Sequence, residues 1–161
     1  MSLIEDIQNC SKCPLRSKLN EFEKPNIGVG SNKPKVMIII DNNVSESIFL
    51  IDGIKLEYLE KNIKLYNINK SNLYITPMIK CARKPTVKSM KACLNWISEE
   101  MRVLNPERII MISSNFDVSY RTTFPKSIEW YDVSLAKLAS STAMDTKYTD
   151  TIFRKIKQYC D

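Results

Sequence analysis

Short apolar runs alternate along the chain with longer segments in which apolar residues recur every three or four positions. The runs at residues 36–40, 73–76 and 109–112 are nearly continuous, which predicts strands buried on both faces. A weaker run at 127–133 predicts a fourth strand. Such runs, each entered from a polar segment, are typical of a parallel sheet in the interior of a domain.

Three sets of apolar residues recur at the spacing of one helix face and predict helices between and after these strands. The sets are Ile54, Tyr58, Leu59 and Ile63; Met90, Leu94, Ile97, Met101 and Leu104; and Ile152, Ile156 and Tyr159. Alternating strands and helices place helices on both faces of the sheet. We therefore expect an α/β fold of three α/β/α layers with a central, mainly parallel sheet, and residues 1–161 in a single domain.

Composition excludes several classes of chemistry. The 161 residues include no histidine, which removes histidine-based general bases, nucleophile pairs and zinc sites. Three glycines are too few for a glycine-rich phosphate loop. No stretch of about 18 residues is apolar enough to span a membrane. The first residues lack the basic region followed by an apolar region that is typical of a signal peptide. A cytoplasmic protein without membrane contact is expected.

The net charge of +6 comes from one part of the chain. Residues 61–98 contain eight basic side chains and no Asp or Glu, whereas the remainder is slightly acidic. A concentrated basic excess favours a polyanionic partner, most simply nucleic acid, although a solvated lysine-rich surface has the same composition. The candidate contacts to nucleic acid are Lys80, Arg83, Lys84, Lys88 and Lys91.

The five cysteines form two spaced pairs and one single residue. Cys10 and Cys13 are two residues apart in the pattern C-x2-C, Cys81 and Cys93 follow C-x11-C, and Cys160 is second from the end. Four thiolates without imidazole suit an iron–sulfur cluster or an all-cysteine zinc site, and the wide second spacing fits zinc knuckles less well. Alternatively, Cys93 is a small buried apolar residue and Cys81 an incidental thiol. Cys160 is expected to be a surface thiol near a frayed terminus.

Four stretches of the chain resemble family 4 uracil-DNA glycosylases in order and spacing, over about residues 8–113. They are CSKCPLR at 10–16, GVG at 28–30, YITPMIKC at 74–81 and LNPERII at 104–110. The resemblance implies a three-layer α/β/α fold and a [4Fe–4S] cluster, and zinc stays the alternative metal that the cysteines themselves allow. The ligands that it implies are Cys10, Cys13, Cys81 and Cys93.

The chain departs from this family at the positions that would carry catalysis. Where the family has G-E-A-P-G, residues 40–44 read IDNNV, which keeps a carboxylate at Asp41, the single candidate catalytic residue. Pro77 stands where the family has the asparagine that reads uracil, and residues 132–134 read DVS in place of H-P-S. These substitutions remove both the residue that reads the base and the group that stabilises the leaving base, so we expect that base excision has been lost. The expected remnants of the base pocket are Asp41, Asn42, Phe49 as a stacking ring, and Pro77.

Three functions are compatible with these residues. The first is an iron–sulfur protein that has lost base excision and binds DNA without sequence preference, or serves a DNA or RNA polymerase or another replication or transcription protein. The second is an active DNA glycosylase with altered damaged-base specificity, in which Asp41 orients water. The third is a protein-interaction subunit whose basic surface contacts an acidic partner. The first is favoured because the basic residues adjoin the implied ligands Cys81 and Cys93.

Overall fold

The computed structural model describes residues 3–8, 28–40, 53–78, 87–113, 128–133, 138 and 143–161. Its helices and strands are, in chain order, α1 (Leu3–Gln8), β1 (Val29–Gly30), β2 (Val36–Ile40), α2 (Gly53–Leu65), the 3-10 helix η2 (Lys70–Asn72), β3 (Leu73–Pro77), α3 (Val87–Leu104), β4 (Arg108–Ile112), β5 (Glu129–Tyr131) and α5 (Ala143–Cys160). Among these helices none is long and apolar enough to cross a bilayer.

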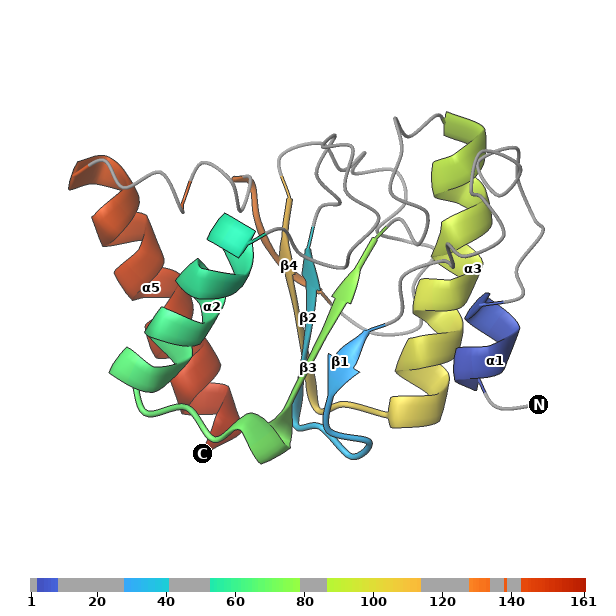
Figure 1. Cartoon of the computed structure of the whole chain (residues 1–161), viewed down its shortest axis with the longest axis horizontal. Coiled ribbons are helices and arrows are strands. Elements are labelled where there is room, and N and C mark those ends of the chain that lie inside the picture. Colours follow the sequence, from blue (N-terminus) through green and yellow to red (C-terminus); the bar gives the residue numbers. More distant parts are fainter. Residues whose placement is uncertain are drawn as a thin grey trace.

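The strands form one five-stranded sheet in the order β1-β3-β2-β4-β5 (Figure 1). β2, β3, β4 and β5 run parallel, and β1 is an antiparallel edge strand next to β3. Parallel strands need a crossover connection, which is usually a helix. In the chain, α2 lies between β2 and β3, and α3 lies between β3 and β4. The predicted α/β fold is confirmed, and all four predicted strands are present within a residue or two of their expected limits.

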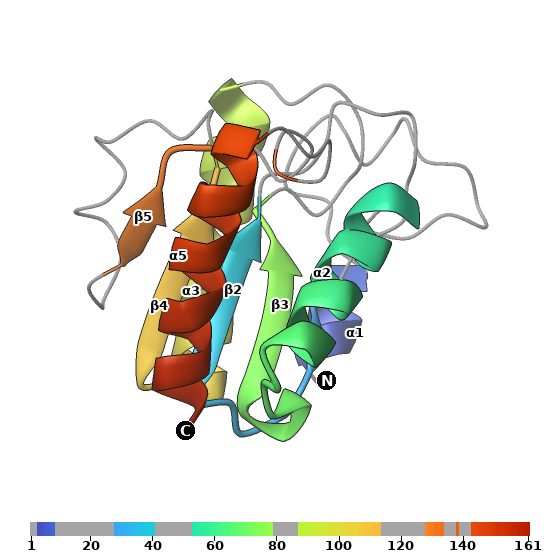
Figure 2. The same ribbon diagram turned by 90° about the vertical axis from the view of Figure 1, so that its left-hand side faces the viewer.

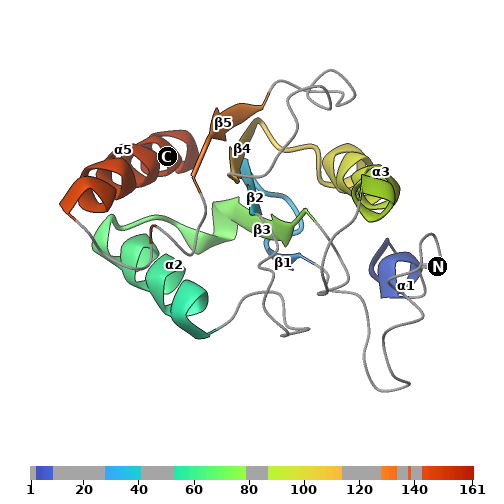
Figure 3. The ribbon, with the colours of Figure 1, turned by 90° about the horizontal axis from the view of Figure 1, so that it is seen from above.

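The side chains of β2 alternate between two cores. Ile38 and Ile40 belong to the core that includes residues of α2 and α5, whereas Met37 and Ile39 belong to the core that includes residues of α3. Figure 3 shows α2 and α5 on one face of the sheet and α3 with α1 on the other. Since helices cover both faces, every residue of β2 is buried, which is why this strand is a continuous apolar run.

Polar contacts join α2 and α5, which lie side by side on one face (Figure 2). The Tyr58 hydroxyl lies 2.7 Å from Thr149 Oγ1, and Tyr66, directly after α2, donates to Asp150 Oδ1 at 2.7 Å. Both tyrosine rings also contact the buried ring of Phe153. These contacts hold the two helices together above the sheet.

The expectation that Cys160 is a surface thiol near a frayed terminus is wrong. Cys160 is the last residue of α5 and is 1% exposed, and burial raises the pKa of its thiol to about 11. Its carbonyl oxygen accepts a hydrogen bond from Asn72 Nδ2 at 2.8 Å, and the carbonyl of Asp161 accepts one from Lys35 Nζ at 3.0 Å. These two bonds fasten the end of α5 to the residues that precede β2 and β3.

Candidate functional site

The carboxyl ends of the four parallel strands lie level with one another. The register pairs Ile40 of β2 with Pro77 of β3 and with Ile112 of β4, and it pairs Ile112 with Tyr131 of β5. The last residues of these strands therefore form one row across the sheet, which we call the carboxyl row. In parallel α/β sheets, ligands bind outside this edge. The carboxyl row is the candidate site.

Three of the predicted base-pocket residues adjoin the carboxyl row in the sequence but lie outside the described residues. Asp41 and Asn42 directly follow Ile40, and Phe49 is further along the same connection. Pro77 is described: it is the buried last residue of β3. Pro77 is therefore part of the carboxyl row, and its role in base reading remains a prediction.

The DVS stretch that replaces H-P-S begins directly after the same row. Asp132 follows Tyr131 and is exposed, Val133 is buried, and Ser134 lies outside the described residues. The Val133 amide donates to the Tyr131 carbonyl at 2.9 Å, which turns the chain sharply after β5. Pro77 and Tyr131 are three strand spacings apart, about 14 Å. A carboxylate thus stands at the opposite end of the row from Pro77.

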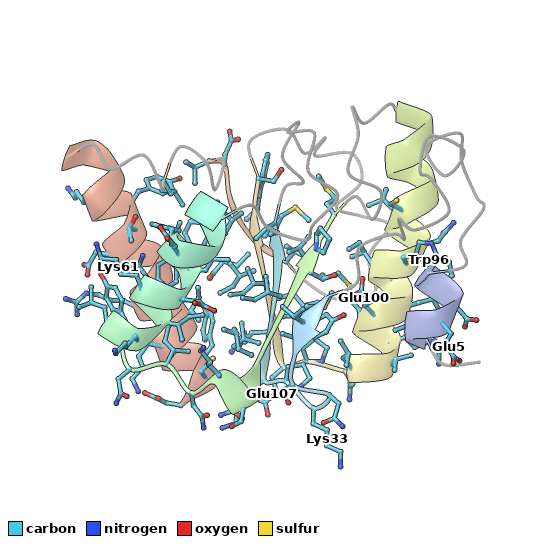
Figure 4. The ribbon with its side chains drawn as sticks, viewed as in Figure 1. Glu5, Lys33, Lys61, Trp96, Glu100 and Glu107 are labelled. Carbon is cyan, nitrogen blue, oxygen red and sulfur yellow. The ribbon has the colours of Figure 1, made fainter. Side chains whose placement is uncertain are left out.

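A buried polar cluster lies behind Pro77, between β3 and α3. Glu100 is 0% exposed, and its Oε2 accepts hydrogen bonds from the Tyr74 hydroxyl at 2.5 Å and from Thr76 Oγ1 at 2.7 Å. In Figure 4 Glu100 points from α3 toward the sheet. The cluster was not predicted from the sequence, although an acid three residues after Ile97 falls on the apolar stripe of this helix.

The environment of Tyr74 keeps its hydroxyl protonated. Burial is the largest cause that raises its pKa above the ordinary value, and the negative charge of Glu100 and the hydrogen bond to it raise it further. Ionised Tyr74 would place a second anion against Glu100 in a site shielded from water. Tyr74 therefore acts as a permanent hydrogen-bond donor that ties β3 to α3.

The GVG stretch at 28–30 has a packing role against β3. A Cβ on Gly28 would stand 2.2 Å from the ring of Tyr74, and one on Gly30 would stand 2.3 Å from the Leu73 carbonyl oxygen. Gly30 also has a φ of +130°, which side chains rarely tolerate. Both glycines are accounted for by the close approach of β1 to β3, and Gly28 is needed because Tyr74 turns toward Glu100.

Of the four implied cluster ligands, only Cys93 lies within the described residues. It is buried at 4% exposure in α3, next to Leu94 of the core on that face. Cys10, Cys13 and Cys81 lie outside them. Within the described part of the chain, no group of three or more Cys, Asp or Glu side chains is placed to hold a metal ion.

The basic residues of 61–98 that the structure describes belong to helices on both faces of the sheet. Lys61 and Lys64 are on α2, and Lys70 is in η2. Lys88 and Lys91 are on α3, on the opposite face of the sheet, and Figure 4 shows Lys61 on the α2 side. Three of the predicted contacts to nucleic acid lie outside the described residues: Lys80, Arg83 and Lys84.

The sequence profile of the uracil DNA glycosylase superfamily matches residues 47–150. This chain belongs to that superfamily. The type-4 uracil-DNA glycosylase of Pyrobaculum aerophilum is 29% identical over 117 residues, which are 68% of this chain and 58% of that protein. The chain is a divergent relative of the type-4 enzymes, and its match spans less than two thirds of the length of this relative.

The superfamily match covers some predicted site residues and not others. Pro77, Cys81, Cys93 and Asp132 lie inside the matched range. The implied ligands Cys10 and Cys13, together with Asp41, precede it. Membership therefore accounts for the α/β fold, and the roles predicted for these residues remain predictions.

Proposed function

We propose that this member of the uracil DNA glycosylase superfamily is an iron–sulfur protein that binds DNA and does not excise uracil. One observation carries the proposal: Pro77 occupies the end of β3 in the carboxyl row. Proline has no backbone N–H and no polar side chain, so it can neither donate a hydrogen bond to the edge of a flipped base nor read that edge with a side-chain amide. The next amide, that of Met78, already donates to the Ile40 carbonyl at 2.9 Å.

The opposite end of the carboxyl row supports the same conclusion. Glycosidic cleavage leaves negative charge on the departing uracil, and enzymes stabilise such charge with preorganised donors or cations. Asp132 instead supplies a carboxylate at the end of β5, and the chain contains no histidine. A carboxylate at this position repels the leaving base and raises the barrier.

The cysteines fit a cluster that links α3 to the segments beside it. Cys81 is three residues beyond Met78, a distance of at most about 10 Å along the chain, and Met78 shares a core with Leu94, the neighbour of Cys93. Cys10 is two residues beyond the end of α1, which contacts α3. An all-thiolate ligand set without histidine suits an iron–sulfur cluster, which supplies structural cross-linking and electron-transfer capacity when bound. The ligands proposed are Cys10, Cys13, Cys81 and Cys93.

The chain between two of these ligands, together with Lys80 directly before Cys81, carries the proposed DNA contacts. Fixing Cys81 and Cys93 restrains the eleven residues between them, and a restrained loop loses little conformational entropy on binding. Phosphate contacts from such a loop give sequence-independent affinity. The contacts proposed are Lys80, Arg83, Lys84, Lys88 and Lys91. In the cytoplasm such a protein would serve a DNA or RNA polymerase or another replication or transcription protein.

Salt-dependent DNA binding tests this assignment. Changing Arg83 and Lys84 to Ala should weaken binding about equally for all sequences and lower the salt slope by up to about two. The matched control changes Lys61 and Lys64 to Ala, which removes the same charge from α2, and it should bind within about twofold of the native protein. If the Arg83 and Lys84 variant keeps the native affinity and slope, the DNA contacts are wrongly assigned.

A second candidate function rests on Asp41. Asp41 directly follows Ile40 in the sequence, and Ile40 pairs with Pro77 in the carboxyl row. In this candidate the Asp41 carboxylate orients water against a different damaged base. Release of a free base from oligonucleotides that contain deaminated or oxidised bases, lost in an Asp41→Asn variant, would favour this candidate.

A lack of DNA binding together with binding to an acidic protein would favour an interaction subunit.

A further inference from the structure

The edge of the sheet at β1 has backbone groups directed away from the molecule's own strands. β1 pairs Gly30 with Tyr74, and the Ser31 amide donates to the Leu73 carbonyl at 2.9 Å. In an antiparallel ladder, hydrogen-bonded pairs of residues alternate with non-hydrogen-bonded pairs. Because Ser31 and Leu73 form a hydrogen-bonded pair, the neighbouring residues Gly30 and Tyr74 form a non-hydrogen-bonded pair. The amide and carbonyl of Gly30 therefore point outward, and among the described residues neither has a hydrogen-bond partner. An edge of this kind is a template for another strand.

An apolar hollow lies beside this edge on the α2 face. It has a volume of about 130 Å³, and its walls come from β1, α2 and β3, with Val29, Leu59, Ile63 and Ile75 among them. Gly30 also lines the hollow and has no side chain to fill it. Val29 is 50% exposed, although it belongs to a strand. The hollow is large enough for an aliphatic side chain and is open to solvent.

Lysines surround the hollow more than acids do. A second hollow of about 390 Å³ continues from the first, since Glu60, Ile63 and Lys70 line both, and Lys64 lines the second. Lys64 and Lys70 are exposed and form no ion pair within the described part of the chain. Among the described residues that line these hollows, Glu60 is the single acid, so Lys64 and Lys70 favour a ligand with an acidic group beside an apolar one.

We propose that the β1 edge binds an extended segment of a partner protein, which adds to the sheet as a strand beside Gly30. An aliphatic side chain of that segment fills the hollow next to Val29 and Leu59. An acidic side chain two positions along, on the same face of the added strand, meets Lys64 and Lys70. Backbone pairing supplies affinity, and the aliphatic and acidic pair supplies specificity. This surface lies on the face of the sheet opposite α3, the helix that carries two of the proposed DNA contacts, Lys88 and Lys91.

A fluorescence-anisotropy titration tests the proposal on the full chain. The probe is a labelled peptide in which a leucine and an aspartate stand two positions apart among serines and threonines. Saturable binding is expected, and Lys70→Glu should weaken it at least about fivefold. Lys147→Glu, the same charge change at an exposed position of α5, should alter it less than about twofold. DNA affinity of Lys70→Glu should remain native, which separates this surface from the DNA site.

Two further probes examine the strand pairing itself. N-methylation of the peptide amides that would face β1 should weaken binding about tenfold, because each lost amide removes a backbone hydrogen bond. Amide resonances of Val29, Gly30 and Ser31 should shift when the unmodified peptide binds. Equal binding of the methylated peptide, equal loss in Lys147→Glu, or no saturable binding would overturn the proposal. A concentration-dependent dimer that pairs through Gly30 would assign the edge to a second copy of the chain and would also overturn it.

Discussion

Tyr74 Oη and Glu100 Oε2 lie 2.5 Å apart, and this hydrogen bond joins the central sheet to α3. Tyr74 belongs to β3, three residues before Pro77, and Glu100 belongs to α3, seven residues after Cys93. The contact therefore connects the strand that ends in the proposed base pocket with the helix that carries one proposed cluster ligand. We expect it to determine how rigidly the carboxyl row is held.

Tyr74→Phe should destabilise the protein by about 1–3 kcal/mol, because a buried carboxylate loses one of its hydrogen-bond donors. Urea denaturation followed by circular dichroism measures the change. Tyr148→Phe is the matched control: Tyr148 is 42% exposed, and its change should cost less than about 0.5 kcal/mol. A Tyr74→Phe variant as stable as this control would show that the hydrogen bond to Glu100 contributes nothing to folding.

Stability should fall at alkaline pH through Tyr74. Its pKa is raised in the folded protein above the ordinary value of 10.0. Below pH 10 both states keep the proton; above it the unfolded chain loses the proton while the folded chain retains it, so the free energy of unfolding decreases. The slope from this group approaches about 1.4 kcal/mol per pH unit. Tyr131, whose pKa is raised to about 12 mainly by burial, adds to the loss between pH 10 and 12.

The pH dependence is checked by comparing variants across the same range. Denaturation of the native chain and of Tyr74→Phe from pH 8 to 11 should show a shallower decline in the variant, since the group that differs between the two states has been removed. Parallel curves would mean that Tyr74 titrates equally in both states, contrary to its burial beside Glu100.

Gly28→Ala should destabilise the fold by about 1–3 kcal/mol, because the new Cβ would stand 2.2 Å from the Tyr74 ring. The penalty should shrink when Tyr74 is first changed to Val, which removes the ring. A double-mutant cycle by urea denaturation measures this coupling. Additive effects of the two substitutions would rule out the packing explanation for this glycine.

Cys81→Ser should give a colourless and poorly folded protein, because ligands from distant parts of the chain make metal binding part of the folding energy. Cys160→Ala tests the fifth cysteine. It should lose about 1–2 kcal/mol from the core cluster around α5 and keep its iron, sulfide and visible absorption. Anaerobic material with stoichiometric zinc and no acid-labile sulfide would refute the cluster.

The elements that could be predicted are those in which burial leaves a clear pattern of apolar residues. β2 is apolar throughout because both faces are covered, so its sequence alone distinguishes it, and the long apolar stripe of α3 is equally clear. β1 has two residues and one is a glycine, so it has no apolar period to detect. α1 is only six residues long. Both are positioned by tertiary contacts with β3 and α3 rather than by local pattern.

The candidate site was only partly predictable, for reasons that differ between residues. Pro77 could be identified because it lies in the family-like motif at residues 74–81, and the register of β2 and β3 shows that it belongs to the carboxyl row. Glu100 was missed because its hydrogen-bond partners, Tyr74 and Thr76, are more than twenty residues away. The prediction for Cys160 was wrong because a position near the end of a helix suggests fraying. In the structure Asn72 donates a hydrogen bond to the Cys160 carbonyl and holds this end of the helix in place. The basic segment is continuous in sequence, but its described residues belong to α2 and η2 and to α3, which lie on opposite faces of the sheet.

The most direct test of the central claim is a single-turnover excision assay. Anaerobically purified protein, in excess over an end-labelled oligonucleotide containing one uracil, is incubated with single-stranded and duplex substrate, and strand breaks after alkali report excision. With Pro77 in the carboxyl row and Asp132 after β5, the protein should bind the DNA while breaks stay at the level of the protein-free blank. Uracil release that rises with protein concentration, and disappears in Asp41→Asn, would contradict the proposal that this superfamily member has lost base excision.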